Sequence, residues 1–234
     1  MMIRNKKIIK ILFLSLILLF CLHCKANSES NQAISSEKQS EISKVIAPEI
    51  KMAKGNTLIA FSKAKARYLV REQLARLDFP NDAIGETNDI FGNIVLNEEG
   101  EIISESSTII VDMSTLKSDK PRRDNYLRNN ALETSKYPEA KFIIEEVQGM
   151  KWPIGKNIGS VDLELIGKMT VHGVSKPLTW LVEGNVIDGT IFEGTAKTEF
   201  KFSYFDIDIP RLAFIISVED RIRLEFDFTA EIKE

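Results

Sequence analysis

Cysteine is nearly absent from this chain of 234 residues. Its two thiols, Cys21 and Cys24, lie close to the beginning, and no cysteine follows them. A disulfide framework is therefore excluded for the rest of the chain. Histidine is equally scarce, because His172 is the only one after residue 24. Any catalytic triad would have to be built on that residue, and its place in Val171-His172-Gly173 instead predicts a hairpin turn.

Other sequence signatures of catalysis are also missing. The sequence has no Gly-rich phosphate loop, and no two carboxylates have the spacing that marks acid–base catalysis. Charge is nearly balanced, with 31 basic and 34 acidic residues, which argues against a nucleic-acid partner. We therefore predict neither an enzyme nor a metal protein.

The longest apolar run covers residues 11–22 and follows a basic start with Arg4 and Lys10. About a dozen apolar residues are too few for a spanning helix, which needs roughly 20, so we expect a secretory signal. Its end resembles a bacterial lipoprotein signal, in which a cysteine becomes the lipidated first residue. We expect a signal peptide over 1–23 and lipidation of Cys24, with Cys21 as the alternative site and ordinary cleavage as the other interpretation.

The segment that follows, residues 24–54, is predicted to be a flexible tether. Ser, Asn, Gln, Glu and Lys dominate its first half, and it contains no aromatic residue. Such a composition buries too little apolar surface to offset the entropy of ordering. Together with a lipidated cysteine, the tether predicts a membrane-anchored protein of the cell envelope that faces the periplasm or the cell surface.

Residues 55–234 are predicted to form one all-β domain. Apolar side chains alternate with polar ones along 222–232, which is typical of a strand with one buried and one wet face. The same period recurs in earlier stretches, separated by turn-formers such as Glu99-Gly100 and Asp188-Gly189. This pattern predicts an antiparallel sheet.

Two places interrupt the period of two. The apolar parity changes at Tyr204-Phe205, after a predicted strand through Phe200, Phe202 and Tyr204, which indicates a bulge or sharp bend. Residues 123–135 predict one short helix that ends before Tyr137-Pro138.

Several motifs occur in an order that resembles the YceI-like domain family. They are Ala66–Leu74, Pro80–Thr87, Gly92–Ile94, Ser114–Leu116, Arg123-Asp124, Tyr137–Phe142 and the hairpin Gly167–Pro177. The resemblance covers about residues 57–232. It implies an extended, lipocalin-like antiparallel β-barrel that binds long isoprenoid or other amphiphilic chains in its interior, without catalytic machinery or a resident cofactor.

One family position differs. Many members have an Arg-Ser-Asp-Phe-Gly-like segment where this chain has Phe202–Asp206. If that arginine holds a charged head group in relatives, this protein would hold its ligand differently, which favours a neutral or different head. Arg67, Arg71 and Arg76 remain candidates for a polar clamp.

The interior decides between two functions. A barrel of about eight strands is either filled by its own side chains or wide enough for one small ligand. We expect a bound amphiphile, and the alternative is an interaction module with a packed core that presents loops such as 77–87 or 149–159. A lipid hydrolase or isomerase is a more distant third, and a homodimer is left open. Alternation predicts these inward-facing residues: Tyr68, Val70, Ile94, Val111, Phe142, Leu165, Trp180, Phe200 and Phe202.

Two carboxylates, Glu72 and Asp124, belong to no catalytic or metal-binding motif. Glu72 interrupts an apolar face, which suggests a buried hydrogen bond, but a wet strand edge is the favoured interpretation. Asp124 is expected to cap the local chain or form a local ion pair rather than to contact a ligand.

Overall fold

The computed structural model describes residues 53–155 and 159–234. The predicted signal peptide 1–23, both cysteines and nearly all of the predicted tether 24–54 lie outside these residues. Within them, no helix has the length and apolar character needed to cross a membrane.

The described part is built from ten strands, all paired antiparallel. They are β1 (Thr57–Leu74), β2 (Asn81–Thr87), β3 (Ile90–Leu96), β4 (Thr108–Asp112), β5 (Lys117–Ser118), β6 (Glu139–Gln148), β7 (Gly159–Val171), β8 (Val174–Ile187), β9 (Ile191–Phe200) and β10 (Ile215–Lys233).

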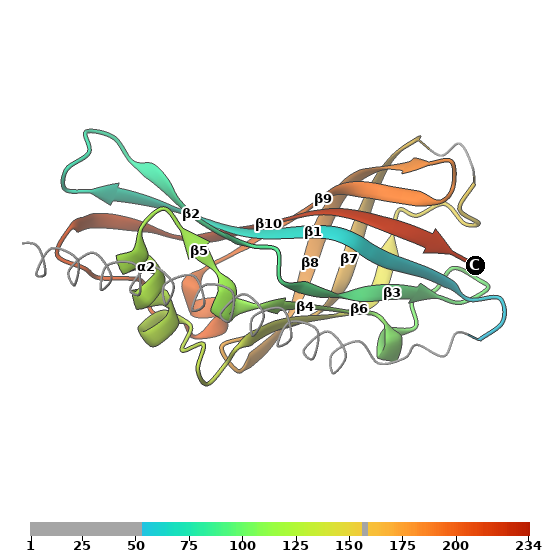
Figure 1. Cartoon of the computed structure of the whole chain (residues 1–234), viewed down its shortest axis with the longest axis horizontal. Helices are drawn as coiled ribbons and strands as arrows, with labels where there is room; N and C mark the ends of the chain where they lie inside the picture. Colours follow the sequence, from blue (N-terminus) through green and yellow to red (C-terminus); the bar gives the residue numbers. More distant parts are fainter. Residues whose placement is uncertain (1–52, 156–158) are drawn as a thin grey trace, which may run out of the picture. The chain divides into compact units, whose positions relative to one another are not determined.

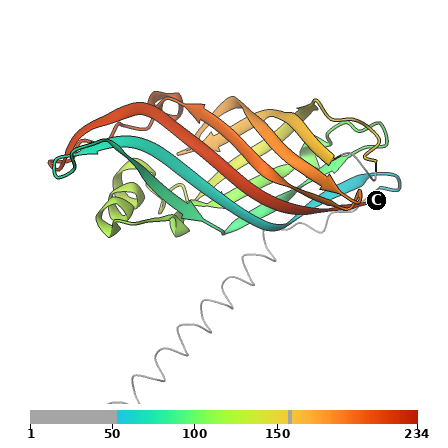
Figure 2. The ribbon, with the colours of Figure 1, turned by 90° about the horizontal axis from the view of Figure 1, so that it is seen from above.

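Eight of these strands close into a barrel. The order β10-β9-β8-β7-β6-β4-β3-β1 is completed by pairing of β1 with β10. β1 pairs with β3 through its first residues and with β2 through Ala66–Glu72. β1 and β10 therefore continue past the closed part, where β2 pairs with β1 and β5 pairs with β2 (Figures 1 and 2). The prediction of an antiparallel barrel is confirmed.

One helical excursion interrupts the strands, as predicted. α2 (Pro121–Tyr126) starts with proline, whose missing N–H costs nothing at the first helical position, and a π turn, η3 (Leu127–Ala131), follows. The predicted helix 123–135 therefore begins two residues earlier and ends four earlier. Two short 3₁₀ segments, η1 (Ser104–Ser106) and η2 (Met113–Thr115), flank β4.

The predicted strand through Tyr204 is wrong. β9 ends at Phe200, and a 3₁₀ turn, η4 (Phe202–Phe205), follows and ends at Asp206 in a left-handed conformation with φ 53°. Phe202 and Phe205 are 5% and 0% exposed. A strand would turn residues of opposite parity to opposite faces, whereas a 3₁₀ turn places residues three apart on the same side. Burial of both rings explains the expected bend.

The hairpin turns follow the sequence signals. His172 and Gly173 have φ 51° and 75° between β7 and β8, and Asp188 and Gly189 have φ 52° and 70° between β8 and β9. Positive φ at both central residues is the type I′ geometry that matches the twist of antiparallel strands. His172 is thus a turn residue, as predicted.

Candidate functional site

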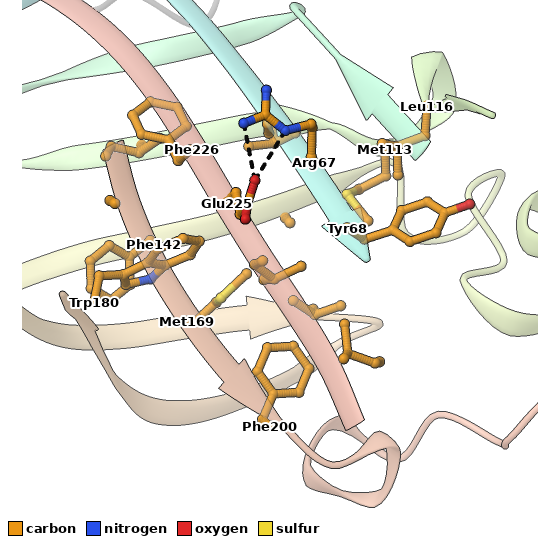
Figure 3. Close-up of a pocket in the computed structure, with 18 of the residues that line it drawn as sticks. Arg67, Tyr68, Met113, Leu116, Phe142, Met169, Trp180, Phe200, Glu225 and Phe226 are labelled. Atoms are coloured by element: carbon orange, nitrogen blue, oxygen red, sulfur yellow. Dashed lines mark hydrogen bonds and ion pairs between the residues drawn. The ribbon is translucent and has the colours of Figure 1, made fainter. Parts of the chain in front are cut away.

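A cavity of about 820 Å³ lies inside the barrel. Each of the eight closed strands contributes apolar side chains to its wall, because one face of every strand points inward. All nine residues predicted from alternation line it: Tyr68, Val70, Ile94, Val111, Phe142, Leu165, Trp180, Phe200 and Phe202. Figure 3 shows Tyr68, Phe142, Trp180 and Phe200 around this space. Their contact with a ligand stays a prediction.

The wall leaves the space open because several of its side chains are short. Ala131, Ala140 and Ala196 are buried members of the wall, 3% to 4% exposed. Leu127 and Leu132 of the helical excursion also line the cavity, on the same side as Ala131, as their spacing predicted. An interior filled by its own side chains, which the alternative function assumed, is not observed.

The α2 end of the cavity is polar. Arg123 on α2 donates a hydrogen bond from Nη2 to Glu72 Oε1 on β1 at 2.6 Å, and these side chains are 14% and 5% exposed. Arg123 also pairs through Nη1 with Asp119. The favoured interpretation of Glu72 as a wet edge is therefore wrong. The cause is α2, which brings a guanidinium to the inward face of β1.

Tyr68 lies beside this ion pair and also faces the cavity. Its hydroxyl is buried and has no partner at hydrogen-bond distance among the described residues. Burial raises the pKa of Tyr68 to about 12, although the positive charge of Arg123 acts in the opposite direction and Ser118 lies near enough to lower the pKa as well. The hydroxyl is therefore a neutral donor at physiological pH.

Trp180 supplies a second such donor in the wall. Within the described residues its Nε1 is buried and unpartnered, and its ring lies 6.2 Å from that of Phe142. Buried polar atoms normally have a partner, because leaving one unpaired costs free energy. A ligand oxygen could accept a hydrogen bond from Tyr68 or Trp180.

Asp124 serves the local chain, as expected. Its Oδ1 accepts hydrogen bonds from the backbone N and the Oγ of Ser118, at 2.9 and 2.6 Å, which ties β5 to α2. It is not among the residues that line the cavity.

The three arginines proposed as a clamp have different positions. Arg67 pairs with Glu225 and Asp227 across β1 and β10, and Arg71 pairs with Asp82. Figure 3 shows the Arg67–Glu225 contact. Arg67 and Arg76 both line the cavity, and Arg71 does not. Sequence reasoning did not single out Arg123 as a cavity residue, since its position depends on how α2 packs against β1.

The described residues contain no cluster of metal ligands. No three His, Cys, Asp or Glu side chains in 53–155 and 159–234 gather as metal ligands. His172 Nε2 lies 2.8 Å from Glu133 Oε2 at the β7–β8 turn and does not line the cavity.

An eight-stranded antiparallel barrel closed around an apolar cavity is the architecture of the lipocalin-like barrels. The profile of the YceI-like domain matches residues 61–230, so this chain belongs to the YceI-like domain family.

Relatives at the sequence level are UPF0312 proteins. One from Vibrio parahaemolyticus is 29% identical over 149 residues, which cover 60% of this chain and 72% of that protein. One from Pseudomonas putida is 37% identical over 79 residues, which cover 32% of this chain and 37% of that protein.

Solved structures share the fold. A polyisoprenoid-binding domain from Saccharophagus degradans superposes with a TM-score of 0.55 at 11% identity, covering 76% of this chain and 98% of that domain. The YceI protein of Campylobacter jejuni gives a TM-score of 0.51 at 19% identity, covering 69% of this chain and 91% of that protein.

Proposed function

We propose that this protein binds a long-chain isoprenoid-like or fatty amphiphile inside its barrel and holds or carries it at a membrane of the cell envelope, anchored through lipidated Cys24. The observation that carries the proposal is the apolar cavity of about 820 Å³. Its volume falls within the roughly 300–1,000 Å³ of ligand pockets in general.

The energetics suit an apolar tail. Burial stabilises each methylene by about 0.8 kcal/mol, so about ten methylenes contribute on the order of 8 kcal/mol, which is near micromolar affinity before ordering costs. Such a tail needs no charged contact. The polyisoprenoid-binding domain with the same fold supports this class of ligand.

The polar end of the cavity suits a head that carries oxygen. Glu72 and Arg123 neutralise each other at 2.6 Å, while the Tyr68 hydroxyl lacks a partner in the described residues. We expect the head of the ligand to accept a hydrogen bond from Tyr68, with the tail along Phe142 and Trp180.

Binding without chemical turnover is part of the proposal. The wall offers no histidine to act as a base, since His172 lies at a turn beside Glu133. The protein would therefore release the ligand that it took up.

Mass spectrometry of the bound lipid tests the proposal. The full chain is purified under native conditions from a bacterial envelope, extracted with organic solvent and compared with an Ala196→Phe variant, which places a ring inside the cavity. Thr179→Phe is the matched control. Thr179 precedes Trp180 on β8, but its side chain lies on the exposed face of the strand. We expect a stoichiometric long-chain species from the parent and the control, and little from Ala196→Phe. A parent that is empty and accepts no added isoprenoid or fatty amphiphile would contradict the proposal.

A further inference from the structure

Exposed apolar side chains concentrate at one end of the domain. Leu77 and Phe79, in the turn after β1, are 46% and 80% exposed. Phe214, just before β10, and Ile216, the second residue of β10, are 44% and 67% exposed. We call these four residues the apolar tip. Pairing of Leu74 with Ile215 holds the two segments together, and both views show them at the same end (Figures 1 and 2).

The apolar tip is continuous with the cavity. Leu74, Arg76, Leu212 and Ile215 from these two segments line the cavity, and Phe214 both lines it and is exposed. The cavity therefore reaches the surface beside the tip. A ligand that enters or leaves there passes the exposed rings and aliphatic chains.

Basic residues surround this opening. Arg76, Arg122 and Arg211 are exposed, and the first two also line the cavity. None of these three arginines forms an ion pair with a residue of the described part of the chain. The acidic residue of the β1–β2 turn is Asp78. Apolar side chains flanked by unpaired arginines are the combination that favours the interface of an anionic membrane.

We propose that the apolar tip is a membrane-docking site. Leu77, Phe79, Phe214 and Ile216 enter the head-group boundary of a bilayer, and Arg76, Arg122 and Arg211 contact anionic head groups. The docked tip lets an amphiphile pass between bilayer and cavity without crossing water. This last step rests on the proposed lipid binding, whereas docking itself does not.

A bilayer suits the tip better than a second copy of the chain. A standard protein interface covers about 800 Å² on each partner. The tip offers four side chains on a turn and a strand end, and a membrane interface accepts such a small apolar insertion when basic residues accompany it. Its continuity with the cavity adds a role that a protein partner would block.

Local quenching tests docking in the full chain. An indole is introduced by Phe79→Trp, and by Leu181→Trp as the control, since Leu181 is 57% exposed on β8 away from the tip. Both variants carry the same N-terminus and are mixed with vesicles of phosphatidylethanolamine and phosphatidylglycerol that contain brominated lipid. The signal of the unsubstituted chain is subtracted. We expect quenching and a blue shift at position 79 only. Equal quenching at both positions, or none at 79, would overturn the proposal.

Transfer kinetics test the role of docking. The double variant Phe79→Glu/Ile216→Glu should take up a fluorescent prenyl lipid from the same vesicles at least about tenfold more slowly than the parent. Each new carboxylate disfavours insertion of the tip beside anionic lipid. The amount bound at saturation should equal that of the parent and of Leu181→Glu. An unchanged rate would refute the exchange role. A parent that loads no lipid at all would refute the proposed function, and the quenching result would still decide docking. Absence of quenching in Phe79→Trp, together with a change of oligomeric state in Phe79→Glu, would assign the tip to a second copy.

Discussion

The middle of the barrel and the α2 end bury their side chains in different ways. In the middle, apolar residues such as Phe142 and Trp180 come from alternate strand positions and surround an open cavity. At the α2 end, Glu72 and Arg123 form a buried ion pair beside the unpartnered hydroxyl of Tyr68. The middle provides volume, and the α2 end provides the few polar groups that can orient a ligand.

The two regions also depend on different contacts. The middle follows from local periodicity, since each strand presents every second residue inward. The α2 end depends on a contact between residues 51 positions apart, Glu72 on β1 and Arg123 on α2. A single substitution in the middle changes the shape of an existing cavity, whereas one at the α2 end leaves a buried charge without its partner.

The largest expected effect is the loss of stability in Arg123→Met. Glu72 is 5% exposed and would be left without its guanidinium. Breaking a buried pair by removing one partner costs about 3–5 kcal/mol. The free energy of unfolding, measured by urea denaturation, should fall by this amount.

A double variant separates the pair from the packing of α2. Glu72→Leu combined with Arg123→Met removes both charges, and such replacements are often close to neutral. We expect it to recover most of the stability lost in Arg123→Met. If the double variant is as unstable as the single variant, Arg123 stabilises the protein through the packing of α2, and the unpaired charge of Glu72 is not the cause of the loss.

The next largest effect is a difference in stability between two truncations in the middle of the barrel, one in the packed core and one in the cavity wall. Ile144 on β6 is 0% exposed and does not line the cavity, whereas Leu165 on β7 does. Ile144→Ala should cost about 2–5 kcal/mol, because it opens a new void. Leu165→Ala should cost less, since a side chain that faces empty space has fewer contacts to lose. Urea denaturation of both variants checks the order, and equal losses would mean that the cavity wall is as tightly supported as the core.

The middle region could be predicted from the sequence, and the α2 end could not. Alternation identified Phe142, Leu165 and Trp180 as inward-facing because strand geometry is local. The same rule placed Phe202 in the wall for a wrong reason, since it lies on a 3₁₀ turn rather than a strand. Periodicity could not tell a filled interior from a hollow one, because that depends on which short side chains face one another.

Glu72 shows where sequence reasoning stops. Its position on the apolar face of β1 suggested a buried hydrogen bond, but its partner was not evident because Arg123 lies on another element. Burial of a charge depends on long-range packing. The apolar tip was hidden for the same reason, since the segments that carry Phe79 and Phe214 come to the same end only through the β1–β10 pairing.

A smaller and more specific effect is expected at Tyr68. Its pKa is raised to about 12, mainly by burial, whereas tyrosine in the unfolded chain titrates near 10. The stability that it contributes is complete below about pH 10 and is lost as the pH rises towards 12. Absorbance titration of tyrosinate should show a late step that belongs to Tyr68.

Tyr68→Phe should remove that late step and also weaken the binding of an amphiphile with an oxygen-bearing head by about tenfold, the value of one hydrogen bond. Binding of a pure hydrocarbon chain should be unchanged and serves as the control. Equal weakening for both ligands would show that the hydroxyl does not contact the head.

The smallest effect is expected for the exposed counterpart of the buried pair, Glu133 with His172. The hydrogen bond from His172 lowers the pKa of Glu133. A carboxylate with a lowered folded pKa stabilises the protein above its ordinary titration range, and the contribution is lost as the pH falls through the folded pKa. Glu133→Gln should therefore flatten the acid side of the stability curve slightly. The midpoint of urea unfolding, measured across acidic pH at low and high salt, compares the parent with Glu133→Gln.

High salt should abolish the difference in stability between the parent and Glu133→Gln, because exposed ion pairs are screened. It should leave the stability lost in Arg123→Met nearly unchanged. If Glu133 still contributes to the free energy of unfolding at high salt, the Glu133–His172 pair is less accessible to solvent ions than its exposure indicates.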